Sequence, residues 1–149
     1  MYNLKTSGGS YKGFAGEIMF KLTRKNAVLT RYWSRQKFMQ LFRFRLTDEQ
    51  TGFLYDNWYS IDCIEVTDRP TIYEIKTKNE YNTKIPFLQK ITKNTVRIYE
   101  EAQKIGFNVV SATVFFKENW DYEVEESEFD SHKYYIDKPK RYDKKSQNG

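Results

Sequence analysis

The chain has 149 residues, a formal net charge of +5 and 17% aromatic residues. This length predicts one domain with a hydrophobic core, and the positive charge favours a polyanionic partner. A single cysteine, Cys63, excludes an internal disulfide and a cysteine-based zinc site, and the single histidine, His132, lies in a polar region that disfavours histidine catalysis. No apolar run reaches membrane-spanning length and no signal-peptide pattern is present, so we expect an intracellular protein.

The N-terminal part of the chain predicts a flexible lead, a helix and a strand. Residues 1–10 are polar and end in Ser-Gly-Gly-Ser, which is typical of a flexible segment. Residues 27–33 predict a first strand. Residues 11–24 predict a helix, because apolar residues recur there at helical spacing: Phe14, Ile18 and Leu22, with Met19 beside them.

The next segment is basic and aromatic. Residues 38–46 fit a helix with one apolar face and fit equally a strand with Arg43 and Arg45 on its polar side, so both alternatives stay open. Arginines among aromatic residues suit nucleic-acid contact, because the charges neutralise phosphates and the flat rings stack on exposed bases. The alternative is a core-facing stripe with solvated basic residues behind it. Residues 47–57 predict a polar connection.

The centre of the chain predicts a pair of adjacent strands. Residues 59–66 and 71–78 are rich in aromatic and β-branched residues, and the segment between them contains Asp68 and Pro70, which mark a turn. Downstream, residues 79–86 predict a loop. Residues 87–105 then predict a helix closed by Gly106, and residues 107–117 predict a buried strand reached by crossover.

Two carboxylates interrupt these apolar strands. Asp62 and Glu74 stand among isoleucines, and carboxylates are rare in such positions unless they are paired or bind a metal. On neighbouring strands they would converge, with Lys76 beside them. Together with the Ile75 carbonyl, they would form a hard oxygen site suited to Mg²⁺. The alternative is an exposed edge hairpin with Glu74 and Lys76 as a solvated pair.

Asp62, a turn and Glu74-Ile75-Lys76 resemble the D…ExK core of the PD-(D/E)xK nuclease superfamily, although Ile61 stands where the superfamily's name has proline. The predicted order of elements over residues 11–117 is similar to its restriction-endonuclease-like fold. That fold is an α-β-β-β-α-β core of the α/β class, with a central mixed sheet flanked by helices. Residues 118–149 would be a charged C-terminal extension. Small single-domain members include archaeal Holliday-junction resolvases and compact viral nucleases.

The resemblance implies a Mg²⁺-dependent nuclease, with Mn²⁺ as a substitute, that hydrolyses phosphodiester bonds in DNA, either as an endonuclease or as an enzyme that processes junctions or single strands. Asp62, Glu74 and the Ile75 carbonyl would hold the cation, and Lys76 would orient the attacking water. Glu17, which lies in the first helix among small residues, would join the metal site through water. The superfamily's helix after the ExK motif often supplies a further polar residue.

Contacts with nucleic acid are expected from basic and polar side chains along the chain: Lys12, Arg35, Arg43, Arg45, Lys93 and Asn94. RNA as the substrate and a homodimeric state stay open. A competing hypothesis is a non-catalytic DNA- or RNA-binding protein on a nuclease-like scaffold, and a third is a structural or interaction protein with charged termini.

Overall fold

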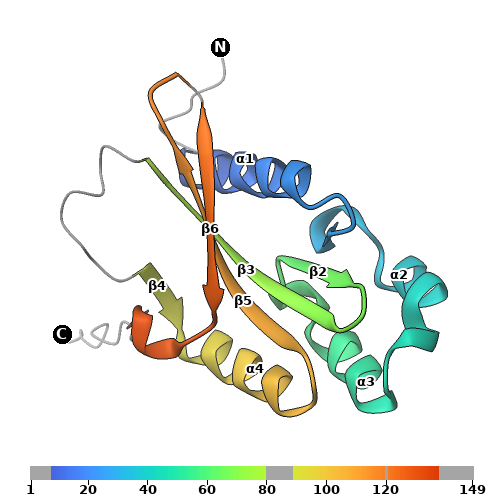
Figure 1. Cartoon of the computed structure of the whole chain (residues 1–149). Coiled ribbons are helices and arrows are strands. Elements are labelled where there is room, and N and C mark those ends of the chain that lie inside the picture. The colour runs from blue at the N-terminus through green and yellow to red at the C-terminus, as the bar shows by residue number, and fades with distance from the viewer. Residues whose placement is uncertain (1–7, 80–88, 120, 138–149) are drawn as a thin grey trace, which may run out of the picture.

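The structure, a computed structural model, describes residues 8–79, 89–119 and 121–137 (Figure 1). It is built around a five-stranded mixed sheet in the order β1-β2-β3-β5-β6. Strands β3 and β5 run parallel, and the other neighbouring pairs are antiparallel. The strands are β1 (Val28–Leu29), β2 (Cys63–Val66), β3 (Pro70–Asn79), β5 (Asn108–Phe116) and β6 (Tyr122–Glu128). The predicted α/β class, with a mixed sheet flanked by helices, is confirmed.

Helices cover both faces of this sheet. Figure 1 shows α1 lying across the sheet on one side, while α2 and α3 gather beside β2. The helices are α1 (Gly8–Thr23), α2 (Arg35–Phe42), α3 (Asp48–Asn57) and α4 (Lys93–Lys104). A second, two-stranded parallel sheet pairs β4 (Gln89–Thr92) with β7 (Tyr134–Asp137).

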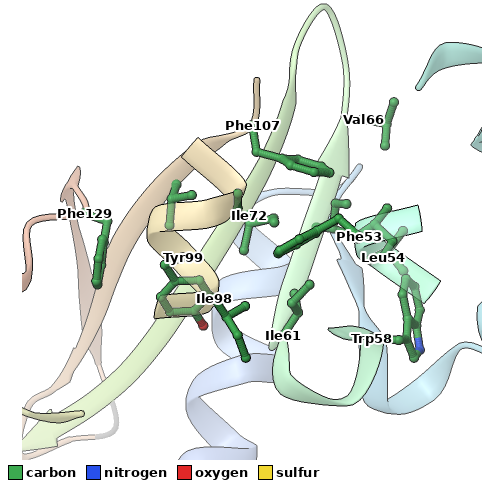
Figure 2. Close-up of a cluster of buried hydrophobic side chains, with 14 of the residues drawn as sticks. Phe53, Leu54, Trp58, Ile61, Val66, Ile72, Ile98, Tyr99, Phe107 and Phe129 are labelled. Atoms are coloured by element: carbon green, nitrogen blue, oxygen red, sulfur yellow. The ribbon is translucent and has the colours of Figure 1, made fainter. Parts of the chain in front are cut away.

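The alternating sides of β3 pack into two separate cores, as the period of two in a strand requires. Ile72 faces α3 and α4, in a cluster with Trp58, Tyr99 and Phe107. Figure 2 shows side chains of α3 and α4 converging over β3 in this cluster. Tyr73 faces the other way and packs with Phe20 of α1.

The pairing and the turn of the central hairpin follow the prediction, but its first strand, predicted over residues 59–66, begins only at Cys63, because Trp58–Ser60 forms a 3₁₀ turn. Strands β2 and β3 pair with Cys63 opposite Tyr73 and Val66 opposite Pro70, so the turn lies where Asp68 and Pro70 indicated. The Arg45 guanidinium donates to the Thr67 carbonyl at 2.6 Å and so fastens this turn to the segment after α2. Gly106, at φ 104°, closes the region after α4 as expected, because only glycine adopts that conformation readily.

Helix α1 has the predicted position, but its apolar stripe does not face the sheet. Phe14, Ile18 and Leu22 are exposed, and the helix meets β3 with Gly16 and Phe20. A Cβ on Gly16 would lie 2.0 Å from the Thr77 Oγ1 atom. At Gly16 the helix therefore lies too close to β3 for a larger side chain. Gly16 faces the sheet there, and the apolar stripe faces away from it.

Two predictions before the hairpin are wrong. Residues 47–57 form α3 and not a connection, because Thr47 and Gln50 make a capping box that nucleates the helix. The first strand ends at Leu29, and Thr30–Tyr32 forms a 3₁₀ turn whose Thr30 hydroxyl donates to the Ile61 carbonyl. In the basic segment the helical alternative holds up to Phe42, after which Arg43–Arg45 forms a 3₁₀ turn.

Two further differences follow the hairpin. The helix predicted from residue 87 begins at Lys93, because Gln89–Thr92 pairs as β4 and Thr92 caps the helix. The acidic segment, for which the sequence indicated no element, supplies β6 and pairs along β5. The flexible lead predicted over residues 1–10 is wrong for residues 8–10, which form the first residues of α1. Residues 1–7 of that lead, the loop from residue 80 to 86, residues 87 and 88 of the predicted helix, and the tail from residue 138 lie outside the described residues.

Candidate metal and nucleic-acid site

Asp62 and Glu74 meet at the start of β2. Cys63 pairs with Tyr73, so the same antiparallel register puts Asp62, the residue just before β2, opposite Glu74. Alternation puts both on the face that carries Ile64 and Ile72, which pack beneath α4. The two acids that the sequence singled out therefore belong to one side of the sheet.

The environment of Asp62 disfavours its charge. Burial raises the pKa of Asp62 to about 7, and the nearby negative charge of Glu74 contributes in the same direction. The backbone N–H of Ile75 donates to Asp62 Oδ2 at 3.0 Å and opposes this rise. The Glu17 carboxylate adds to the rise and the Lys76 ammonium opposes it. All four predicted catalytic side chains thus act on one site.

Glu74 is buried and has two partners from the protein. Lys76 Nζ lies 3.1 Å from Glu74 Oε2, and the Tyr99 hydroxyl of α4 donates to Glu74 Oε1. Burial, together with the negative charge of Glu74, raises the pKa of Tyr99 well above its usual value. The phenol therefore stays a proton donor to Glu74 at neutral pH.

Glu17 is buried and paired with Arg31. The guanidinium forms a two-point ion pair with the carboxylate, with Nε 2.9 Å from Oε1 and Nη2 3.0 Å from Oε2. The hydrogen bond to Glu17 raises the pKa of Arg31, so the guanidinium stays charged. A pocket of about 420 Å³ has both Glu17 and Asp62 in its wall, completed by Thr30, Arg31, Trp33, Tyr59 and Ile61.

The backbone of Ile75 contacts the Asp62 carboxylate. Its N–H donates to Asp62, and the N–H and C=O of one strand residue point to the same neighbouring strand. The antiparallel pairing of β2 ends at Cys63 with Tyr73. The Ile75 carbonyl therefore faces the same side of β3 as its N–H, beyond the last paired residue of β2.

The donor set of this site is made of oxygen atoms. Across residues 8–79, 89–119 and 121–137, no group of three or more His, Cys, Asp and Glu side chains is placed to hold a metal ion. What the described residues offer is two carboxylates, from Asp62 and Glu74, with the Ile75 carbonyl between them. This set fits a hard cation that keeps several waters.

Sequence reasoning missed two residues of this site, Arg31 and Tyr99. Tyr99 could have been found, because it follows Val96 and precedes Ala102 at helical spacing on the buried side, and a buried tyrosine hydroxyl needs a partner. Arg31 gave no comparable signal, since it was placed within a predicted strand that in fact ends at Leu29.

The predicted nucleic-acid contacts lie in several places. Arg35 donates to the Tyr55 carbonyl at 2.6 Å, and Arg43 lines a separate surface hollow of about 690 Å³ between α2 and α3. Arg45 fastens the hairpin turn, as described above. Lys93 and Asn94 are exposed in the first turn of α4, where Asn94 accepts a hydrogen bond from Arg97. Lys12 lies on α1, and its side chain is outside the described part of the structure.

No family model, curated protein or solved structure matches this chain. None of the helices in the described ranges combines the length and the apolar character needed to cross a membrane. The function therefore has to be argued from the site itself.

Proposed function

We propose that the protein is a metal-dependent nuclease that hydrolyses phosphodiester bonds, with DNA as the first candidate substrate. The observation that carries this proposal is the pair of carboxylates, half-buried Asp62 and buried Glu74, opposite each other beside Lys76. Burial and the neighbouring charge of Glu74 raise the pKa of Asp62, and two carboxylates in such a setting gain from a shared cation, because the cation removes the repulsion between them.

The order of the elements supports membership of the PD-(D/E)xK superfamily. Along the chain, α1, β1, β2, β3, α4 and β5 follow the α-β-β-β-α-β order, with α2 and α3 between β1 and β2 and the short β4 before α4. The parallel pairing of β3 with β5 agrees with a crossover through α4. In this proposal Asp62, Glu74 and Lys76 correspond to the superfamily's D…ExK motif.

The cation in this proposal is Mg²⁺, with Mn²⁺ as a substitute. Asp62, Glu74 and the Ile75 carbonyl would bind it directly, and Glu17 would contribute through water. When bound, the cation supplies the positive charge that polarises the phosphate and promotes ionisation of a water.

The remaining roles belong to the protein's own side chains. Lys76 is partly exposed beside Glu74, so its ammonium can hold the attacking water and neutralise charge that develops on the phosphate. Tyr99 is a positioning residue, because its hydroxyl fixes the Glu74 carboxylate from α4. Arg31 positions Glu17 in the same way through its two hydrogen bonds.

A specific observation favours a second candidate, a non-catalytic nucleic-acid-binding protein. Glu17 is neutralised by Arg31, and Glu74 is neutralised by Lys76 and held by Tyr99. Asp62, with its pKa near 7, is partly protonated at neutral pH. The charges of these side chains therefore nearly cancel one another without a bound metal cation.

A cleavage assay separates these candidates. Plasmid, single-stranded DNA and RNA are incubated with the protein in Mg²⁺, Mn²⁺ or EDTA. We expect metal-dependent cleavage that is lost in Asp62→Asn, Glu74→Gln and Lys76→Met. Glu65→Gln is the matched control, because Glu65 is also a β2 carboxylate but lies on the opposite face, bonded to the Tyr73 hydroxyl. Undiminished cleavage by Asp62→Asn or Glu74→Gln would refute the site, and no cleavage by the unmodified protein would favour the second candidate.

A further inference from the structure

Three exposed aromatic rings belong to or lie near the pocket that contains Asp62 and Glu17: Tyr59 is in its wall, and Phe14 and Tyr32 lie beside Arg31 of that wall. Tyr59 lines the pocket and is 86% exposed, and Tyr32 is 51% exposed. Tyr32 stacks on Phe14 with ring centroids 5.8 Å apart and an angle of 28° between the planes. We call Phe14, Tyr32 and Tyr59 the aromatic rim. The stacked Phe14–Tyr32 pair leaves contiguous apolar surface exposed, and such surface marks an interaction site more often than a single exposed ring does.

Cations lie beside the rings around this pocket. The Arg31 guanidinium is 4.7 Å from the centroid of the Phe14 ring, and the Arg35 guanidinium is 6.0 Å from that of Tyr59. Lys37 Nζ is 5.1 Å from the ring of Trp33, which lines the pocket. Residues 30–46 contain no acidic residue, and their basic residues are Arg31, Arg35, Lys37, Arg43 and Arg45.

Aromatic rings and cationic side chains that lie close together suit a ligand with both accessible flat bases and phosphates. The faces of bases in a duplex are covered by neighbouring bases, so rings of the protein can stack only on unpaired bases. A duplex offers its phosphates to the cations but no surface to the rings. An acidic peptide would likewise use the cations and leave the rings without flat partners.

We infer that the aromatic rim binds unpaired nucleotides and directs single-stranded nucleic acid to the carboxylate site. Bases stack on Tyr59 and on the Phe14–Tyr32 pair, while Arg35 and Lys37 neutralise the phosphates between them. The inference rests on the proposed function for the position of the cleaved bond, next to Asp62 and Glu74. It specifies the substrate class as a single strand or an unpaired region of DNA or RNA.

The test is a binding measurement that requires no cleavage. Fluorescence anisotropy in EDTA at low salt compares a labelled single-stranded DNA, the same sequence as RNA, and the DNA duplex. The proteins are the unmodified chain, Tyr59→Ala, Tyr59→Phe and Phe44→Ala. Phe44 is the matched control, because its ring is 83% exposed and belongs to the same basic segment but lies in the separate hollow between α2 and α3.

We expect single strands to bind more tightly than the duplex. Tyr59→Ala should weaken single-strand binding roughly 5- to 100-fold, the range that loss of one base–ring stack produces. Tyr59→Phe should keep most of the affinity, since the ring remains, and Phe44→Ala should bind like the unmodified protein. The stronger of the DNA and RNA signals identifies the sugar.

Equal affinity for duplex and single strand, or the same loss in Phe44→Ala as in Tyr59→Ala, would overturn the inference. A failure of the nuclease proposal looks different, because single strands would then bind through Tyr59 but would not be cut in Mg²⁺ or Mn²⁺.

Discussion

Replacing Asp62 by asparagine should stabilise the protein at alkaline pH. The pKa of Asp62 is about 7 in the folded protein, against an ordinary value of 3.8. A carboxyl whose pKa is raised by folding favours the folded state only while it is protonated. Its contribution is therefore fully present below pH 4, is lost as pH rises from about 4 to 7, and is constant above that range.

The size of this effect follows from the pKa difference. At about 1.4 kcal/mol per pKa unit, the ionised Asp62 lowers the free energy of unfolding by roughly 4 kcal/mol above pH 7. Asparagine keeps an oxygen that can accept the Ile75 N–H bond and removes the charge. Asp62→Asn should therefore be more stable than the unmodified protein by up to about 4 kcal/mol at pH 8, and similar to it near pH 4.

Urea unfolding in EDTA between pH 4 and pH 8 measures this difference. Asp56→Asn serves as the control, because it makes the same chemical change at an exposed position of α3 away from the site. If the stability curves of Asp62→Asn and the unmodified protein run parallel from pH 4 to pH 8, Asp62 is not buried beside Glu74 as described. The proposed cation site would then lose its physical basis.

Four further outcomes are expected. Mg²⁺ added at pH 8 should raise the melting temperature of the unmodified protein but not of Asp62→Asn, since a ligand of the folded state stabilises it by mass action; equal shifts would place the cation elsewhere. Tyr99→Phe should lower the free energy of unfolding by about 1–3 kcal/mol, because buried Glu74 loses a donor, and it should slow cleavage while leaving binding of single strands intact; unchanged cleavage would remove its positioning role. Gly16→Ala should destabilise the fold, because its Cβ would lie 2.0 Å from a β3 threonine hydroxyl. Gly13→Ala, on the same helix, meets no atom within 4 Å and should be neutral or stabilising by up to about 1 kcal/mol. Thermal melts that rank the two variants the other way would contradict the close packing of α1 on β3. Single-strand affinity should fall with salt with a log–log slope of about 0.7 per phosphate contact, and salt-independent binding would argue against a nucleic-acid ligand.

Interactions between residues close in the chain were visible in the sequence. The hairpin of β2 and β3 could be predicted with its turn, because a period of two and a Pro-containing turn are local properties. The same alternation puts Asp62 and Glu74 on one face. The capping box of α3 is equally local, since Thr47 and Gln50 are three residues apart in the sequence.

The orientation of α1 was not visible in the sequence. Its apolar period predicted a stripe through Phe14, Ile18 and Leu22, yet the contact with β3 is made by Gly16 and Phe20. Which side of a helix faces a sheet depends on how closely the two backbones approach. That distance is a property of the assembled core, and the exposed stripe contributes one ring of the aromatic rim.

The sequence by itself determined the two acids, the lysine beside them and the strands that carry them, because these follow from alternation along a few residues. Only the tertiary structure decided their chemical state. The pKa of Asp62, the ion pair of Glu17 with Arg31 and the bond from Tyr99 to Glu74 each join residues at least 12 positions apart. Burial and Coulomb interactions act through space, so these partners become neighbours only when α1, the hairpin and α4 pack together.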